Sequence, residues 1–165
     1  MDIDFSEINY LVDPCSRTLH ADYQQFLLSL TGLTVIDIKG ESSNEWRVIS
    51  TLLHGNEPSG LIAVHRWLTT ENSLPQPKAN IRIIISSVEA ATHQHLFSHR
   101  YLPNGVDLNR CFNEEAIRSS KDGENKDIDG YIQRAKLIET AIREVNPRSI
   151  IDLHNTSGNG PAFAV

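Results

Sequence analysis

The strongest constraint on the fold is a set of short apolar runs that have the character of buried strands. Trp46–Leu53, Ile81–Val88 and Ser149–Leu153 are rich in isoleucine, leucine and valine. The run at 81–88 is almost continuously apolar, as expected for a strand that is covered on both faces. Thr34–Ile38 alternates β-branched residues and predicts a further strand.

Helical patterns lie between these strands. Ala21–Leu30, Pro58–Thr69 and Tyr131–Val145 carry apolar residues three and four positions apart, and a proline suits the first turn of the second of these helices. Strands that alternate with helices predict an α/β fold: a mainly parallel or mixed sheet with helices on both faces. We expect residues 1–30 to form an amino-terminal extension and helix, and residues 31–165 to form the α/β domain.

Three stretches have weaker patterns. Residues 1–18 show little periodicity and are expected to lie across the surface. Ser119–Gly130 holds six charged residues and two glycines and is expected to be a mobile surface loop. Ala162–Val165 has the composition of a strand.

Composition excludes several classes of function. The 165 residues suffice for one domain with a sizeable core. With 15 basic and 21 acidic residues the net charge is −6, which argues against nucleic acid or an anionic membrane as a partner. No apolar run approaches the roughly 20 residues that span a bilayer. The acidic amino terminus is unlike a signal peptide, and Cys15 and Cys111 form no paired motif, so we expect a reduced, cytoplasmic setting.

A histidine follows each of two predicted strands. His54 ends the strand at 46–53, Gly55 breaks it, and Glu57 comes three residues after the histidine. His154 follows the strand at 149–153 in the same way. Because the carboxyl ends of parallel strands meet at one edge of a sheet, the two histidines and Glu57 are expected to lie together there. Two histidines and a glutamate make a catalytic zinc site that leaves one position open.

Spacing alone leaves a second interpretation open, in which these are ordinary residues at strand ends. A third segment favours a site. Asp107-Leu108-Asn109-Arg110 offers a planar, two-pronged guanidinium suited to a carboxylate, with an amide beside it and Asp107 placed to hold an arginine. Asp152 is a candidate to orient a ligand histidine, or to cap the end of its strand.

The three motifs H-G-N-E, D-L-N-R-x-F and D-L-H-N, in this order, resemble the zinc carboxypeptidase superfamily and are most similar to its succinylglutamate desuccinylase/aspartoacylase branch. The resemblance implies a zinc-exopeptidase (phosphorylase/hydrolase-like) architecture. It also implies that one zinc ion is held by His54, Glu57 and His154.

The resemblance further implies roles for three other residues. Asn109 and Arg110 would bind the carboxylate of an acyl amino acid, and Arg100 would polarise the carbonyl group of the amide that is cleaved. The expected activity is zinc-dependent hydrolysis of an N-acyl amino acid. Two alternatives remain open: a non-catalytic module that binds zinc and carboxylates, and a zinc carboxypeptidase that acts on peptides.

One element of the family pattern is missing. The family places a glutamate general base on a strand well beyond the D-L-H motif, followed by a β-rich domain, whereas this sequence ends eleven residues after His154. We therefore expect the chain to be the amino-terminal part of a longer enzyme, with its base beyond residue 165 and with little activity alone. A sheet that lacks later strands has an unpaired edge, so self-association is expected.

Overall fold

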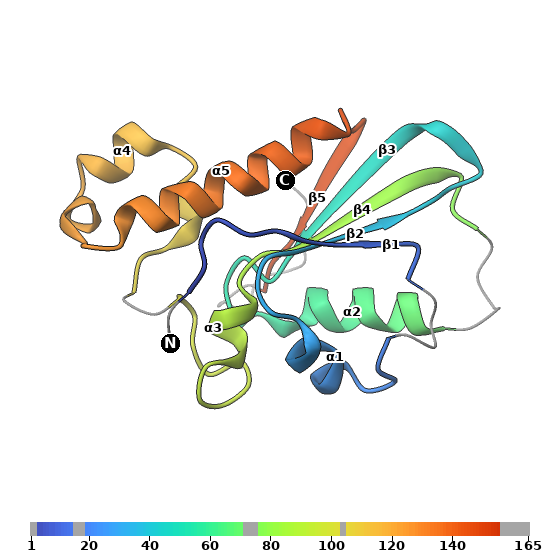
Figure 1. Ribbon diagram of the computed structural model, residues 1–165, viewed down its shortest axis with the longest axis horizontal. Coiled ribbons are helices and arrows are strands. Elements are labelled where there is room, and N and C mark those ends of the chain that lie inside the picture. Colours follow the sequence, from blue (N-terminus) through green and yellow to red (C-terminus); the bar gives the residue numbers. More distant parts are fainter. Residues whose placement is uncertain (1–2, 15–18, 71–75, 103–104, 156–165) are drawn as a thin grey trace.

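Five strands form a single sheet in the computed structural model, which describes residues 3–14, 19–70, 76–102 and 105–155. The sheet order is β1-β2-β4-β3-β5 (Figure 1). The pairs β1–β2, β4–β3 and β3–β5 are parallel, and only the pair β2–β4 is antiparallel. The strands are β1 (Asn9–Val12), β2 (Thr34–Ile38), β3 (Ser42–Thr51), β4 (Ala79–Ile85) and β5 (Ser149–Leu153).

Helices cover both faces of this sheet, which confirms the predicted α/β class with a mainly parallel sheet (Figure 1). The longest helix, α5, lies on one face, and α1 and α2 lie on the other. The helices are α1 (Tyr23–Ser29), α2 (Pro58–Thr69), α3 (Val88–Thr92), α4 (Glu114–Arg118) and α5 (Ile128–Glu144).

The central strand β4 contributes side chains to two separate hydrophobic cores, one on each face of the sheet. Ile84 packs in the cluster under α5, whereas its neighbours Ile83 and Ile85 pack in the cluster over α1 and α2. All three side chains are fully buried. Successive side chains of a strand point to opposite faces, so a strand covered on both sides must be apolar throughout. The continuous run of isoleucines therefore marks the middle of the sheet.

Several predicted elements are confirmed with their boundaries. Thr34–Ile38, Pro58–Thr69 and Ser149–Leu153 begin and end as predicted. Proline at the first position of α2 fixes its start, since a residue there needs no intrahelical N–H bond. The predicted helix Ala21–Leu30 is shorter, because the Asp22 carboxylate caps its start by accepting from two backbone N–H groups.

The expectation that residues 1–18 lie across the surface is wrong for Asn9–Val12, which join the sheet. These residues pair in parallel with β2, in a register that sets Asn9 beside Thr34, and form an edge strand of the sheet. Only alternate side chains are partly buried, so the local pattern is weak. The strand depends on a partner more than twenty residues away. The proposed division at residue 30 stays a prediction.

The expected loop at Ser119–Gly130 is also wrong, because most of it is ordered. Lys121–Glu124 forms a single 3₁₀ turn capped by the Ser120 hydroxyl, and α5 already begins at Ile128, which is buried. Arg118 of α4 donates to Asp129 at 2.7 Å and joins the two helices. Charge and glycine content here mark an exposed surface rather than a lack of structure.

Two further expectations concern membrane-spanning segments and the strand predicted at the end of the sequence. Among the described residues, none of the helices has the length and apolarity needed to cross a membrane. The strand predicted at Ala162–Val165 lies outside the described residues.

Candidate metal centre

The backbone turns sharply where β3 ends, and this turn brings His54 to the edge of the sheet. The predicted strand ran to Leu53, but β3 stops at Thr51 because Leu52 adopts a left-handed conformation with φ 55°. Such a conformation is costly for a residue with a side chain. Ser87 holds it in place: its N–H donates to the Leu52 carbonyl at 2.9 Å and its hydroxyl to the Leu53 carbonyl at 2.8 Å.

Two glycines allow the segments behind the site to approach closely. A β-carbon at Gly55 would lie 2.6 Å from the carbonyl oxygen of His99, and one at Gly60 would lie 2.7 Å from the β-carbon of Leu153. Gly55 also donates its N–H to the Arg100 carbonyl at 2.9 Å. Gly55 thus lets the segment that carries Arg100 pack against the end of β3. Gly60 lets the start of α2 pack against the end of β5.

The structure brings His54, Glu57 and His154 together, with one ligand atom from each lying within 4.8 Å of the others. Glu57 stands between the histidines: its Oε1 is 3.0 Å from His54 Nδ1 and its Oε2 is 2.8 Å from His154 Nδ1. The side chains of His54 and Glu57 are almost fully buried, and that of His154 is 28% exposed. Both histidines therefore present the same ring nitrogen to one carboxylate, beside an opening to solvent.

The other ring nitrogen of each histidine meets an aspartate. His54 Nε2 lies 3.0 Å from Asp107 Oδ1, and His154 Nε2 lies 2.6 Å from Asp152 Oδ2. Once a metal is bound, an aspartate that accepts the Nε2 proton would keep the tautomer in which Nδ1 has lost its proton and offers its lone pair to the ion, the usual arrangement around a metal-bound histidine. The donor set, two imidazoles and one carboxylate, suits zinc. These residues fit a metal ion better than they fit a set of unrelated surface contacts.

Glu57 is held in its charged form although it is buried. Burial alone would raise the pKa of its carboxyl group, but hydrogen bonds from His154, Arg100 and the Asn155 N–H outweigh that effect and lower the pKa. The Arg100 guanidinium donates to Glu57 Oε1 at 2.7 Å. With its pKa lowered, Glu57 is ionised at neutral pH, and the ionised carboxylate is the form that binds a cation.

Arg100 lies beside His54 and Glu57, and it brings an aromatic neighbour that sequence reasoning missed. Its guanidinium carbon lies 5.7 Å from the centre of the Tyr101 ring, and that ring meets His54 edge-on at 6.2 Å. The adjacent position of Tyr101 in the sequence was the only indication of this contact.

Asn109 and Arg110 lie on a single 3₁₀ turn, Leu108–Arg110, which Asp107 joins to the candidate metal ligand His54. The Arg110 side chain is 67% exposed, and its Nε lies 3.8 Å from Asp107 Oδ2. A hollow of about 490 Å³ opens next to both residues and continues along α4. The prediction that Asp107 holds an arginine agrees with this ion pair but missed two other contacts of the carboxylate. Its Oδ1 accepts from the Asn109 N–H at 2.9 Å and bonds His54 Nε2, which joins this segment to the candidate metal ligands.

The sequence and the structure were compared with those of known proteins. The family model of the succinylglutamate desuccinylase/aspartoacylase catalytic domain matches residues 47–161, more than half of the chain. No curated protein matches the sequence. Among solved structures, the crystal structure of the succinylglutamate desuccinylase from Chromobacterium violaceum is similar, with a TM-score of 0.54 and 20% sequence identity. The match covers 80% of this chain and 46% of that one.

At this level of identity the structural likeness shows a shared fold, and the chain spans about half the length of that solved structure. The family match rests on the sequence itself and extends over both histidine motifs and the Asn109-Arg110 pair. The chain belongs to the succinylglutamate desuccinylase/aspartoacylase family.

Proposed function

We propose that this chain carries the metal centre and the carboxylate-binding residues of a zinc-dependent hydrolase that cleaves the amide bond of an N-acyl amino acid. The observation that supports this most directly is the position of Glu57 between two Nδ1 atoms, while each Nε2 atom is bonded to an aspartate. His54, Glu57 and His154 would hold the ion. Bound there, zinc would act as a Lewis acid toward a carbonyl group and would lower the pKa of a water molecule.

Arg100 is the residue placed to stabilise developing negative charge. Its guanidinium lies at the edge of the ligand cluster, donates to Glu57 and remains partly exposed to solvent. A well-aimed donor to the oxygen of the scissile carbonyl lowers an activation barrier by about 3 kcal/mol. Arg100 therefore has both the charge and the access to act on a carbonyl group that enters the site.

Arg110 and Asn109 suit the other end of such a substrate. The exposed Arg110 guanidinium offers two parallel N–H donors to a carboxylate, and its link to Asp107 keeps it beside the ligand cluster. A carboxylate fixed there orients the acyl amide toward the metal ligands, and orientation contributes to rate without any bond being made. This gives a chemical reason for an amino-acid substrate.

The proton-transfer step is not assigned to a described carboxylate near the site. Asp107 and Asp152 are each engaged by a ligand histidine, and Glu89 is paired with buried Arg134 at 2.8 Å. A positioned acid–base residue contributes roughly 10²–10⁴-fold to rate. We therefore propose that this chain alone binds acyl amino acids and turns them over slowly. The engagement of all three carboxylates by other side chains also favours a second candidate function, a non-catalytic module that binds zinc and carboxylates.

The test combines binding with turnover on the zinc-loaded chain. N-succinylglutamate and N-acetylaspartate are titrated by calorimetry, and release of the free amino acid is followed in parallel. We expect binding that Arg110→Ala abolishes and that Arg143→Ala, a substitution at an exposed arginine on α5, leaves unchanged. Binding that is indifferent to Arg110 would contradict its role. Turnover at ordinary enzyme rates, roughly 1–10³ s⁻¹, would show that the base lies within these residues.

A further inference from the structure

Arg100 and Asp107 approach the same ring nitrogen of His54 from the two ends of one loop. Asp107 Oδ1 lies 3.0 Å from His54 Nε2, and Arg100 Nη2 lies 3.4 Å from it. Arg100 also donates to Glu57 Oε1 at 2.7 Å. The relative position of these two side chains therefore depends on how the two ends of the loop are held together.

Each end of the loop has a local anchor. Gly55 donates its N–H to the Arg100 carbonyl at 2.9 Å, which fixes the first end against the site. At the second end, the Asp107 carboxylate accepts from the Asn109 N–H at 2.9 Å. This bond orients the carboxylate relative to its own 3₁₀ turn, but it does not connect that turn to the first end.

A single phenol connects the two ends. Tyr131 lies in the first turn of α5 and is fully buried. Its hydroxyl donates to the carbonyl of Leu102, two residues after Arg100, at 3.1 Å. Burial raises the pKa of Tyr131 to about 12, whereas a hydrogen bond from the Val106 backbone acts to lower it. A bond with that effect donates to the phenol oxygen, so its donor is the Val106 N–H, one residue before Asp107.

The phenol oxygen thus acts as donor and acceptor toward one loop. It donates on the Arg100 side and accepts on the Asp107 side. Gly105 donates its N–H to the same Leu102 carbonyl at 3.1 Å, with a φ of 82° that glycine adopts without strain. Tyr131 adds to this turn the connection to the residue that precedes Asp107. Its hydroxyl therefore limits how far Asp107 can move relative to Arg100.

The ring of Tyr131 is held independently of its hydroxyl. It packs in the cluster under α5, with its centre 5.1 Å from that of the Phe5 ring. Phe5 lies close against Gly130, where a β-carbon would be 2.5 Å from a ring carbon. These contacts are apolar. The substitution Tyr131→Phe therefore removes two hydrogen bonds and keeps the packing of α5.

We propose that Tyr131 is a positioning residue of the metal centre: by joining Leu102 to Val106, it holds the Asp107 carboxylate against His54 Nε2. This role rests on the metal site proposed above. Asp107 orients His54 toward the ion, and displacement of the carboxylate weakens the bond that does so. Tyr131 acts through the backbone of the loop and contributes no atom to the metal.

The first test is the zinc affinity of the whole chain, measured by competition with a chromophoric chelator, with folding checked by circular dichroism. We expect Tyr131→Phe to weaken binding roughly tenfold, a loss typical of groups that orient a metal ligand. Because the effect passes through Asp107, it should fall to about twofold or less in an Asp107→Asn background. It should persist in full in Asp152→Asn, which affects the other histidine.

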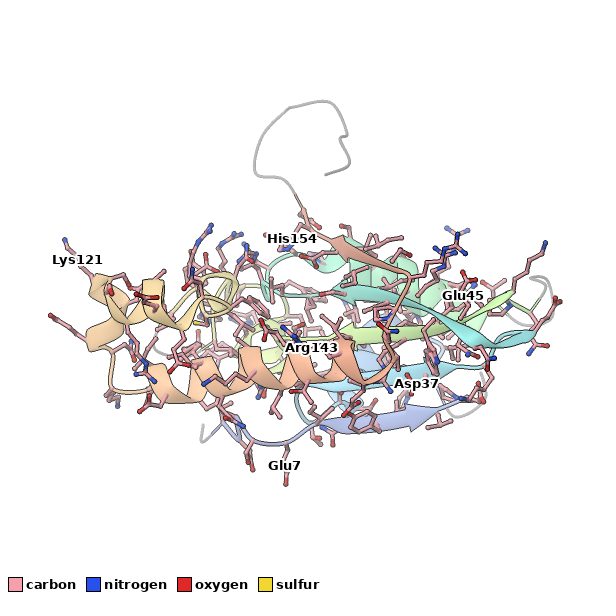
Figure 2. The ribbon with its side chains drawn as sticks, turned by 90° about the horizontal axis from the view of Figure 1, so that it is seen from above. Glu7, Asp37, Glu45, Lys121, Arg143 and His154 are labelled. Atoms are coloured by element: carbon pink, nitrogen blue, oxygen red, sulfur yellow. The ribbon has the colours of Figure 1, made fainter. Side chains whose placement is uncertain are left out.

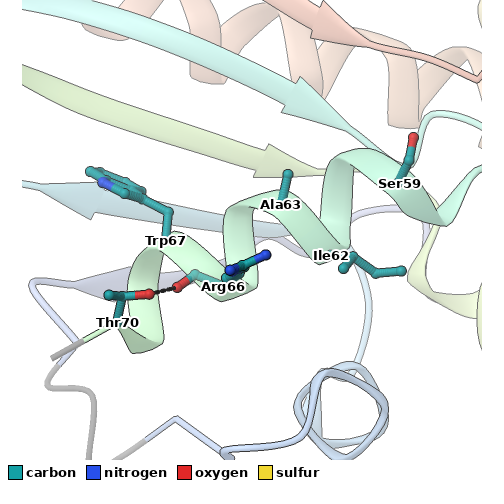
Figure 3. A pocket seen from close by; sticks show the side chains of 6 residues that line it. All are labelled: Ser59, Ile62, Ala63, Arg66, Trp67 and Thr70. Carbon is teal, nitrogen blue, oxygen red and sulfur yellow. Dashed lines mark hydrogen bonds between the residues drawn. The ribbon is translucent and has the colours of Figure 1, made fainter.

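Two control variants separate this effect from a general loss of stability. Ile138→Val removes a buried methylene group about two turns further along α5, toward Arg143 (labelled in Figure 2). Ile62→Val removes one beside α2, in an apolar hollow of about 660 Å³ (Figure 3). Any loss of stability in these variants should leave zinc affinity unchanged, although Ile62 is much nearer than Tyr131 to Glu57 in the sequence.

Nitrogen-15 NMR of the histidine rings gives a second test that requires no metal. In the metal-free chain, Tyr131→Phe should move the His54 Nε2 resonance in the same direction as Asp107→Asn does. The resonances of His154, which is bonded to a different aspartate, should stay in place. An unchanged His54 resonance overturns the proposal.

The zinc measurements can overturn the proposal in three ways. Tyr131→Phe could bind zinc as tightly as the native chain, lose the same factor in the Asp107→Asn background, or lose no more than a control variant loses. A native chain that binds no zinc would instead refute the metal site of the proposed function. In that case the NMR result decides alone: a shifted His54 resonance supports the contact that Tyr131 maintains, and an unchanged one overturns it.

Discussion

Replacing either aspartate that contacts a ligand histidine should weaken zinc binding, and by different factors. In Asp107→Asn and Asp152→Asn the amide oxygen still accepts the Nε2 proton, so the tautomer is kept and only the negative charge is lost. The charge makes the imidazole a better donor to the metal. The two variants therefore measure the electrostatic contribution of each aspartate without removing a hydrogen bond.

The structure predicts which loss is larger. Loss of such a partner typically lowers metal affinity by about 10–100-fold, or roughly 1.4–2.7 kcal/mol. The side chain of Asp107 is 17% exposed and bonds the buried His54, whereas that of Asp152 is 41% exposed and bonds the partly exposed His154. Solvent screens the second interaction more strongly. We expect a loss of about 100-fold for Asp107→Asn and about 10-fold for Asp152→Asn.

The assay is competition for zinc against a chromophoric chelator at pH 7, repeated at low and high ionic strength. The Asp152→Asn effect should shrink with added salt, and the Asp107→Asn effect should change little. Asp129→Asn is the control, since this exposed carboxylate on α5 pairs with Arg118 and should not affect affinity. Equal losses at the two positions, or a larger loss at Asp152, would refute the reasoning from burial.

Three further predictions concern the fold that holds the site. Glu89→Ala should lower the free energy of unfolding by about 3–5 kcal/mol in urea denaturation, because it leaves the fully buried Arg134 guanidinium without its carboxylate. Burial raises the pKa of the Cys111 thiol from 9.0 to about 11. The unfolded chain therefore loses this proton first, and stability should fall between pH 9 and 11 more steeply in the native sequence than in Cys111→Ala. Gly55→Ala should reduce both the thermal midpoint and zinc affinity, because its methyl group would lie 2.6 Å from a side chain of α3.

The parts of the fold that sequence predicts well are those specified by local chemistry. Proline at position 58 starts α2, and the alternation within Thr34–Ile38 defines β2 without help from the rest of the chain. β1 was missed for the opposite reason, because its pairing with β2 is non-local and its own residues are half exposed. The five-residue helix α4 is too short for a periodic pattern, and its local markers are the Asn113 cap and the acidic residues Glu114 and Glu115 of its first turn.

In the candidate site, too, some features follow from local sequence and others depend on the folded structure. Two histidines at strand ends and a glutamate three residues after the first indicated which side chains gather, since parallel strands align their carboxyl ends, but the Asn109-Arg110 segment and the family resemblance were needed to favour a site over ordinary strand-end residues. The left-handed backbone of Leu52 was not predictable, because a leucine carries no preference for it and Ser87 imposes it from another strand end. The bond between Asp107 and His54 spans 53 positions and depends on the finished fold.

The central claim is that His54, Glu57 and His154 form one metal site, and zinc content tests it most directly. The purified chain is loaded with zinc, dialysed against metal-free buffer and analysed by mass spectrometry for metal per folded chain. We predict about one zinc ion per chain, with loss of that ion in Glu57→Ala and His154→Ala and retention in His95→Ala, a substitution at an exposed histidine. A folded chain whose zinc content is no higher than that of Glu57→Ala would contradict the account.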